Sequence, residues 1–441
     1  MPAFLGLLYN FIAIPLLMFA VGVGTLVNKK VRRAVLGRRA LFVQLRKKMA
    51  LLDPSAPRLW IHACSMGEFE QARPLIAALR QRIPNVAVVL SVTSPSVRDH
   101  IAEGTESDVV TYLPLDTLHG ARRFVRVVRP HIGVVVRHDI WPNHIAALKR
   151  SGAPAVLIDA SLSAKISPGR WRGRLVGRLL YSSFDYILAT SAQEVERLRA
   201  AAGAGPTIMA VGDTRYDQVK RRSMENDKVR DLQQYFGAAA QPIFLAGSTW
   251  PADERHLLPA LRSLRDELDG LRAIFVPHEP KDEHLEELER QLAAQGLTSL
   301  RLSAWRQGAK ADGSVLVVDE VGILANLYSV ADVAYVGGGF TTGVHSVLEP
   351  AVYGIPVLFG PHHLNSNEAL DLVRRGGGFA VNNAEEIEEC LNHLLRDGKA
   401  REAAGRQARA MVEERMGASA RIVELLEKIL REQKARGRLA R

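Results

Sequence analysis

Short runs of apolar residues alternate along most of the chain with longer stretches whose apolar positions have helical spacing. Such runs are typical of buried strands, and strands that alternate with helices are typical of parallel sheets covered on both faces. Strands are predicted in two groups, at 59–63, 86–92, 109–113, 132–136, 155–158, 186–189 and 207–211, and at 242–246, 273–276, 314–318, 333–336, 356–359 and 378–381. The sequence therefore predicts an α/β fold with two doubly wound, Rossmann-like domains, and a ligand cleft between the carboxyl ends of their sheets.

Two stretches interrupt or end this alternation. Residues 213–241 are mostly charged or polar and predict a linker with an entry helix, and residues 384–441 predict a helical, basic tail. We accordingly expect an N-terminal segment at 1–28, a first domain at 29–220 and a second domain at 221–441.

The N-terminal segment has the composition of a membrane anchor. No charged residue occurs from Pro2 to Asn28, which is long enough for a helix to cross a hydrocarbon core of roughly 30 Å. The basic residues that follow it, with no acidic residue among them, are Lys29, Lys30, Arg32, Arg33, Arg38, Arg39, Arg46, Lys47 and Lys48. A cleaved signal peptide would carry its positive charges before the apolar run. The positive-inside rule then keeps the rest of the chain in the cytoplasm, with the basic segment against anionic headgroups. A buried core helix is the alternative.

Composition changes this picture little. The chain has 441 residues, enough for two cores, and a formal net charge of +11. The charge is unevenly placed and few aromatic residues are interleaved with it, so we expect a membrane rather than a nucleic acid as its partner. Its two cysteines, Cys64 and Cys390, lie far apart. That spacing indicates a reducing compartment and argues against a structural zinc site.

The richest motif is GGGFTTGVHSVLE at 337–349, which follows the strand predicted at 333–336. Its glycines let the backbone approach a ligand closely. A helix predicted to begin near His345 would direct its first N–H groups at a phosphate. Glu349, one helical turn after His345, would then accept hydrogen bonds from a sugar diol. The alternative is a glycine-rich turn with a packed histidine and a solvated glutamate.

The motif HACSMGE at 62–68 ends the first predicted strand. Glu68 opens a helix predicted to run to about Arg82, where its carboxylate can take a proton from an incoming hydroxyl group. The alternative is a capping box formed by Ser65 and Glu68, in which the helix dipole favours a charged, weakly basic carboxylate.

Two further strand ends in the first half carry polar groups. The loop SVTSPS at 91–96 offers hydroxyl groups to a polar substrate, although such loops are usually helix caps. The loop RHDIWPN at 137–143 brings together a cation, an imidazole and the carboxylate of Asp139. A local ion pair with Trp141 buried as a packing anchor explains that loop equally well.

In the second half, AGSTWP at 246–251 and VPHEP at 276–280 also end strands. Three strand ends, at Gly247, Pro277 and Gly337, thus meet at one edge of a sheet. None of them is a P-loop or a GxGxxG motif, so they favour a nucleotide-sugar pocket. These loops contain no HExxH, DxD, CxxC or GxSxG pattern, and we therefore expect no cofactor and metal-independent transfer.

Taken together, the motifs resemble those of the 3-deoxy-D-manno-octulosonic acid (Kdo) transferase family of lipopolysaccharide assembly. The resemblance covers nearly the whole chain and rests on the N-terminal anchor together with HACSMGE at 62–68, LPLD at 113–116, IWPN at 140–143, ASLS at 160–163, GDTRYD at 212–217, AGST at 246–249 and the segment 337–361. It implies a GT-B fold and inverting transfer of Kdo from CMP-Kdo to a lipid A precursor, lipid IVA. It also implies attachment at the cytoplasmic face of the inner membrane.

The resemblance assigns roles to individual residues. It implies that Glu68 is the general base, with Asp139 as a second catalytic residue, and that Glu349 binds the CMP ribose. The acceptor would contact Ser65, Gly67, Thr93, Ser94 and Arg137. The donor would contact Gly247, Ser248, Thr249, Pro277, His278, Gly337, Gly338, Gly339, Gly343, His345, Ser346 and Glu349. Arg122, Arg123, Arg126 and Arg129, predicted on one helix, would meet the acceptor's phosphates unless they form a solvated face.

The chain departs from the family pattern at three places. It has PHEP at 277–280 where the family commonly has PRHP, RHD at 137–139 where it often has ETE, and Ser346 where an Asn usually follows the histidine. Two other functions keep the same fold: a sugar-nucleotide epimerase, which has no use for a membrane anchor, and an inactive, membrane-tethered nucleotide-sugar binding protein, which tolerates loss of Glu68.

Overall fold

The computed structural model describes residues 3–101, 106–163, 166, 169, 171–225, 227–237, 242–268, 271–309 and 315–437. Within these residues the chain divides into two compact units, which are described separately. Unit 1 comprises Met1–Gln218 and Met416–Arg441, and unit 2 comprises Val219–Arg415. Ser314, predicted to start a strand, lies outside the described residues, as do the two ends of the chain.

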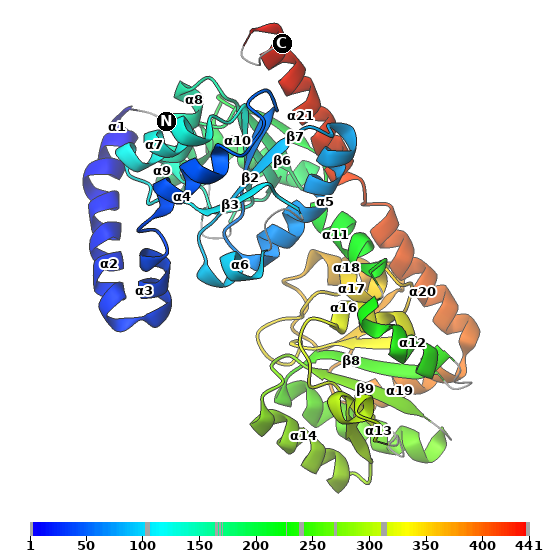
Figure 1. Cartoon of the computed structure of the whole chain (residues 1–441). Helices are drawn as coiled ribbons and strands as arrows, with labels where there is room; N and C mark the ends of the chain where they lie inside the picture. Colours follow the sequence, from blue (N-terminus) through cyan, green and yellow to red (C-terminus); the bar gives the residue numbers. More distant parts are fainter. Residues whose placement is uncertain are drawn as a thin grey trace. The chain divides into compact units, whose positions relative to one another are not determined.

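Unit 1 is built on a parallel sheet of seven strands in the order β3-β2-β1-β4-β5-β6-β7 (Figure 1). The strands are β1 Arg58–His62, β2 Ala87–Val92, β3 Val109–Tyr112, β4 Ile132–Val136, β5 Ala155–Ala160, β6 Tyr186–Ala189 and β7 Thr207–Ala210. Nearly every position of the first six strands is at least half-buried, because helices cover both faces of the sheet. The strands predicted in this half are therefore confirmed to within two residues at either end.

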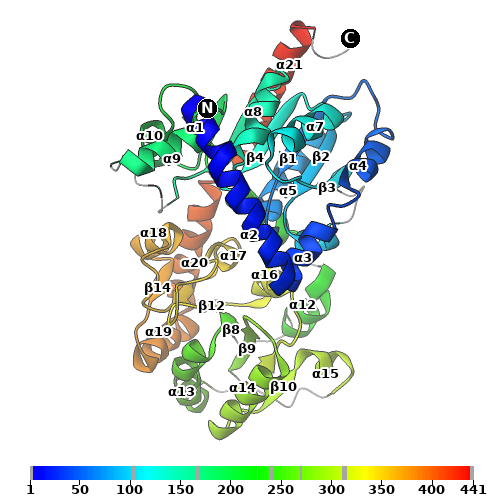
Figure 2. The same ribbon diagram turned by 90° about the vertical axis from the view of Figure 1, so that its left-hand side faces the viewer.

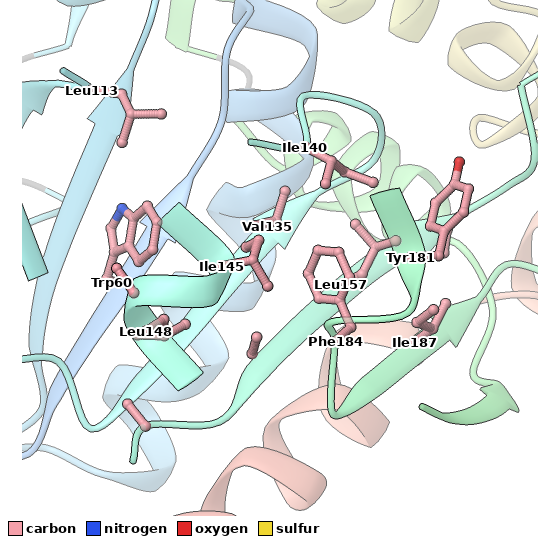
Figure 3. Packing of buried hydrophobic residues seen from close by; sticks show 14 of the residues in the cluster. Trp60, Leu113, Val135, Ile140, Ile145, Leu148, Leu157, Tyr181, Phe184 and Ile187 are labelled. Carbon is pink, nitrogen blue, oxygen red and sulfur yellow. The ribbon is translucent and has the colours of Figure 1, made fainter. Parts of the chain in front are cut away.

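The helices of unit 1 connect these strands. They are α1 Ala3–Leu8, the π-helical turn η1 Tyr9–Ala13, α2 Ile14–Val27, α3 Lys29–Leu36, α4 Leu41–Met49, α5 Met66–Arg82, α6 Pro95–His100, α7 Leu118–Val128, α8 Pro142–Arg150, α9 Trp171–Tyr181, α10 Ala192–Ala202, α11 Thr214–Ser223, which continues into unit 2, and α21 Ala418–Ala435. One face of the sheet packs against α4, α7, α8 and α10. Figure 3 shows this core, with Trp60 and Val135 on the strands and Leu148 on α8.

The opposite face of the sheet carries α5 and α21. The apolar side chains of α21, among them Ile422, Leu426 and Ile429, lie in one buried cluster with Leu75 and Leu79 of α5. This packing corrects the expected extent of the second domain, 221–441. The last helix belongs to unit 1 because its apolar face is buried on the first sheet, although it follows the whole of unit 2 in sequence.

Unit 2 repeats the design with seven parallel strands in the order β10-β11-β9-β8-β12-β13-β14. The strands are β8 Ile243–Thr249, β9 Arg272–Pro277, β10 Ser299–Arg301, β11 Val315–Val317, β12 Val333–Val336, β13 Val357–Phe359 and β14 Gly378–Ala380. Only β10 was not predicted. It is a three-residue edge strand with half-exposed positions, so it lacks the buried apolar run on which the prediction depends.

The helices of unit 2 include the predicted entry helix and most of the helical tail. They are η2 Asp227–Val229, α12 Arg230–Gly237, α13 Pro251–Glu267, α14 Asp282–Ala294, α15 Leu302–Arg306, α16 Leu324–Leu327, η3 Tyr328–Val330, α17 Leu348–Ala351, α18 Asn367–Arg375, α19 Ala384–Arg396 and α20 Gly398–Glu413. Among the described residues, one helical stretch, Phe4–Val27 in unit 1, is long and apolar enough to cross a membrane, judged by length and composition.

Candidate functional site

Strand register brings the predicted motifs of unit 1 to one edge of its sheet. His62 at the end of β1 pairs with Ser91 on β2 and with Val135 on β4. The loops that follow these strands begin at the same level, because the strands are parallel and in register. The motifs 62–68, 91–96 and 137–143 therefore lie together at the carboxyl edge of the sheet.

Glu68 lies in the first turn of α5, and its side chain is 8% exposed. Its Oε2 atom accepts a hydrogen bond from the Cys64 N–H at 2.7 Å, and its own N–H donates to Ser65 Oγ at 3.3 Å. Ser65 is thus the N-cap, but the predicted capping box is formed only in part, because the Glu68 carboxylate accepts from the Cys64 N–H in place of the Ser65 N–H. The cap holds the Glu68 carboxylate in one orientation at the sheet edge and leaves its role as a base a prediction.

Asp139 follows β4, and its Oδ2 atom lies 2.9 Å from Nε2 of the buried His62. Burial acts to raise the pKa of Asp139, but the hydrogen bond and the charge of His62 outweigh it, so the pKa lies below its usual value. His62 is held from its other side, where Nδ1 lies 2.9 Å from Ser91 Oγ. Ser91 Oγ also accepts from Trp60 Nε1 at 2.8 Å. Asp139 is consequently a fixed negative charge and a weak base.

Both carboxylates act on the thiol of Cys64, the residue whose backbone N–H donates to Glu68. Burial is the main reason that the pKa of its thiol is raised, and both Glu68 and Asp139 add to the shift. The two predicted catalytic residues therefore act on the same small volume at the carboxyl edge of the sheet. Their combined negative charge favours a neutral or cationic neighbour at this place.

The other predicted acceptor residues follow the same three strands. Thr93 donates from Oγ1 to the Cys64 carbonyl oxygen at 3.3 Å, Ser94 starts α6, and Gly67 lies in the first turn of α5. Arg137 has a positive φ of 58°, which is uncommon for a residue with a side chain. Its Nε atom is buried without a hydrogen-bond partner among the described residues. The charge of Arg137 acts on the buried carboxylate of Asp159, whose pKa burial raises to about 7.

Arg38 was predicted only as part of the basic segment that faces lipid headgroups. Its guanidinium group instead donates to the carbonyl oxygens of Leu113 at 2.8 Å and Thr93 at 3.2 Å. Burial lowers its pKa, while the charges of Tyr112 and Asp139 act in the opposite direction. No local pattern indicates this placement, since it depends on how the turn between α3 and α4 packs on the ends of β2 and β3.

The predicted donor residues of unit 2 meet at the carboxyl edge of the second sheet. Gly247 on β8 pairs with Val336 on β12 and with Val276 on β9, so the three loops begin side by side. Any side chain at Gly337 would collide with the Ser248 carbonyl group, and one at Gly339 would collide with Gly360. These glycines are needed for close packing between loops.

The histidines of the donor motifs form a stack with Trp250. His278 lies between Trp250 and His345, with ring centroids 4.8 Å and 4.4 Å apart. Trp250 Nε1 donates to His345 Nε2 at 3.0 Å, so that nitrogen carries no proton. Burial and the charge of His278 lower the pKa of His345, and Asp253 opposes them. The stack keeps His345 neutral and offers aromatic faces at the predicted nucleotide site.

Asp253 is a central residue that the sequence analysis missed. Its buried carboxylate accepts hydrogen bonds from Trp250 N–H and Gly338 N–H, both at 2.9 Å, and from Tyr335 Oη at 2.8 Å. It thereby fixes the glycine-rich loop to the start of α13. An aspartate three residues after Trp250, in the first turn of a predicted helix, was the capping signal that could have found it.

The prediction that a helix begins near His345 is wrong. Residues 343–346 are irregular, and the four-residue α17 begins only at Leu348. Hydrogen bonds from His345 N–H to the Gly337 carbonyl and from Val344 N–H to the His362 carbonyl hold the loop in place of a helical turn. His345 and Glu349 therefore do not share a helix face.

Glu349 lies apart from the ring stack. Its Oε1 atom is 3.5 Å from an Nη1 atom of Arg222, and its charge adds to the effect of burial in raising the pKa of Tyr328. A side chain at Gly247 would collide with the same tyrosine. Of the remaining predicted donor residues, Ser346 is exposed, Gly343 lies close to Asn365, and Thr249 donates to Glu254 inside the fold at 2.8 Å.

Comparison with known proteins adds to this geometry. A family model described as 3-deoxy-D-manno-octulosonic-acid transferase (kdotransferase) matches residues 36–218. The 3-deoxy-D-manno-octulosonic acid transferase of Bordetella pertussis is 28% identical over 386 residues, which cover 85% of this chain and 88% of the relative. That of Haemophilus influenzae is also 28% identical over 386 residues, covering 86% and 88%. The chain thus carries a Kdo transferase family domain at residues 36–218 and is similar over most of its length to Kdo transferases of other bacteria. It is accordingly a glycosyltransferase.

Solved structures support the fold. The UDP-GlcNAc 2-epimerase of Neisseria meningitidis bound to UDP-GlcNAc gives a TM-score of 0.61 at 15% identity, covering 84% of this chain and 100% of that one. An epimerase of Listeria monocytogenes described as putative gives 0.60 at 14%, covering 86% and 97%. At this identity the likeness shows the fold alone. The GT-B fold class predicted for a Kdo transferase is confirmed.

Proposed function

We propose that the chain transfers Kdo from CMP-Kdo to a lipid A precursor, lipid IVA, with inversion at the anomeric carbon and without a metal. The observation that carries the proposal is that Glu68, which accepts from the Cys64 N–H, and Asp139, which lies against His62, follow neighbouring strands at the sheet edge of unit 1, in a chain with a Kdo transferase family domain. We further propose attachment through the N-terminal helix to anionic lipids at the cytoplasmic face of the inner membrane.

In this mechanism the acceptor hydroxyl group lies against Glu68. Its oxygen attacks the anomeric carbon of Kdo while the bond from that carbon to the CMP phosphate breaks. The hydroxyl proton passes to the Glu68 carboxylate, and CMP leaves as an anion. The hydrogen bond from His62 lowers the pKa of Asp139. The negative charge of Asp139 then stabilises the positive charge that develops on the sugar.

The donor would bind unit 2, with the loops at 247–249, 277–278 and 337–339 around cytosine and phosphate. The ring stack of Trp250, His278 and His345 offers a flat face to a base. Glu349 would accept hydrogen bonds from the ribose after displacing the distant contact with Arg222.

The test is a transfer assay with purified full-length chain, CMP-Kdo generated in situ and a tetraacylated lipid A precursor, read as a mass gain on the lipid. We expect Glu68→Gln and Glu68→Ala to lower the rate by about 100-fold or more, because a general base typically contributes that factor. Glu196→Gln, a matched change at an exposed position of α10, should leave the rate unchanged.

Two outcomes would contradict the proposal. If the wild type binds CMP but leaves the lipid unchanged, the chain is a nucleotide-sugar binding protein or uses another acceptor. If Glu68→Gln keeps full activity, Glu68 serves as a helix cap alone.

A further inference from the structure

The N-terminal apolar helix is docked on unit 1 by polar side chains near its beginning. Tyr9 Oη donates to Asp116 Oδ2 at 2.8 Å. Asn10 and Asn143 exchange side-chain hydrogen bonds of 3.2 Å and 2.7 Å. Asp116 and Asn143 are 1% and 2% exposed, so these bonds belong to the packed body of unit 1. Tyr9 and Asn10 begin the π-helical turn η1, a distortion that often marks a functional contact in a helix.

This docking conflicts with a helix that crosses the bilayer. Asn10 precedes Asn28 by 18 residues, about 27 Å along a helix at 1.5 Å per residue. In a crossing helix those residues would lie near opposite surfaces of a hydrocarbon core of about 30 Å. Unit 1 follows Asn28 and would lie on one side, yet its buried Asp116 and Asn143 bond to Asn10 and Tyr9 at the other end.

The rest of the helix surface faces away from unit 1. Leu5 and Ile14 are each 5% exposed, on the docked side. The strongly exposed apolar side chains are Phe4, Phe11, Leu16, Phe19, Leu26 and Val27. The basic helix α3, which lies beside α2 in Figure 2, follows directly. The exposed surface of the helix is apolar on every side and so requires contact with acyl chains, and the cations of α3 at its end suit an anionic headgroup layer.

A second element has the same character. On α9 the side chains of Trp171 and Val176 are 65% and 43% exposed. The opposite side of α9 is packed, with Gly177 so close to Ala201 of α10 that a Cβ would lie 2.9 Å from it. Tyr181 at the end of α9 points into the core beside Leu157 (Figure 3).

Charge indicates the partner of this exposed face. Arg172, Arg174 and Arg178 of α9 are exposed, and the described residues of the helix contain no acidic side chain. Aromatic and aliphatic side chains flanked by arginines are typical of helices that enter an anionic lipid surface. Figures 1 and 2 both place α9 near α1, so the two helices lie at the same part of unit 1.

We propose that the N-terminal helix lies in the plane of an anionic phospholipid bilayer instead of crossing it, and that α9 enters the same leaflet as a second contact. The inference rests on the proposed membrane attachment and adds its topology and a second site. Both helices then lie on the side of the membrane that holds unit 1, and the polar docking at Tyr9 and Asn10 is kept.

The first test locates residue 3. Full-length chain carrying Ala3→Cys is inserted from outside into sealed vesicles of phosphatidylethanolamine and phosphatidylglycerol, treated with an impermeant thiol reagent and analysed by peptide mass spectrometry. We expect residue 3 to react without detergent, as fully as the exposed control Gln307→Cys of unit 2. Protection of residue 3 until detergent is added, with the control already labelled, would establish a crossing helix and overturn the topology.

The second test concerns α9. In the same vesicles prepared with brominated acyl chains, the wild type should lose more tryptophan emission than Trp171→Phe. The control Trp305→Phe should be quenched by the same amount as the wild type. Replacing phosphatidylglycerol by phosphatidylcholine should weaken the quenching of Trp171. No difference between wild type and Trp171→Phe would overturn the contact. Shielding of Trp171 from aqueous iodide without quenching by brominated lipid would indicate a protein partner and also overturn it. Neither test depends on transfer activity.

Discussion

Protonation of a single ring decides the state of the stack at the predicted nucleotide site. His345 accepts a hydrogen bond from Trp250 through Nε2 and stacks on His278, so a proton on that nitrogen would break one contact and strain the other. Asp253, the charged group that faces this ring, only partly offsets the effect of burial. The neutral form of His345 is therefore part of the folded structure.

This leads to a prediction for stability against pH. Because the pKa of His345 is lowered in the folded state, the unfolded chain binds more protons below the ordinary histidine pKa of about 6.5. Stability that is present above that pH should be lost as the pH falls through it towards 5. In urea unfolding, His345→Gln, whose amide oxygen can still accept from Trp250, should lose less stability between pH 7 and pH 5 than the wild type.

A suitable control is His393→Gln, an exposed position on α19. It should reproduce the wild-type dependence on pH. If His345→Gln showed that same dependence, His345 would not be a source of it, and the other histidines with lowered pKa, His131 and His138, would have to account for the slope.

Helix α21 shows how an element can be predicted correctly and placed wrongly. Its apolar spacing predicted a helix, and the helix is present from Ala418 to Ala435. The sheet that it covers is decided by side-chain packing: its buried residues fill the layer beside α5 in unit 1. Asp217 of α11 also accepts from the N–H groups of Gly417 at 2.6 Å and Ser419 at 2.7 Å, which fixes the start of the helix.

We predict that Leu426→Ala destabilises unit 1 by about 2–5 kcal/mol, since Leu426 is fully buried and the cavity cannot be refilled easily. Hydrogen exchange should show faster opening of α5 along with α21. Glu424→Ala, at an exposed position of the same helix, should change stability by less than about 0.5 kcal/mol. Faster exchange confined to unit 2 would contradict the placement of α21.

For the whole molecule, the reaction is predicted to need no metal. Among the residues that the structure describes, no group of three or more histidine, cysteine, aspartate or glutamate side chains is arranged to hold a metal ion. Charge on the leaving CMP would instead meet backbone N–H groups and neutral donors in unit 2. The transfer rate should therefore stay within about twofold after EDTA treatment and dialysis. A loss restored by adding Mg²⁺ would contradict this prediction.

The sequence by itself determined every strand except β10, the α/β class, the apolar N-terminal segment and the family motifs, because these depend on local spacing and on residues close together in the chain. The glycines at 337–339 and the cap formed by Ser65 and Glu68 are of this kind. The predicted site residues of each unit meet at a sheet edge because parallel strands in register end together.

Only the tertiary structure decided contacts between distant segments. It placed Arg38 on the ends of β2 and β3, made Asp253 the anchor of the glycine-rich loop, and replaced the helix expected at His345 with a loop held by long-range hydrogen bonds. It also bonded Tyr9 and Asn10 to unit 1. Each of these placements depends on hydrogen bonds between groups that are not neighbours along the chain, such as Asp253 with Gly338 and Tyr9 with Asp116, and such pairings are not visible in local spacing.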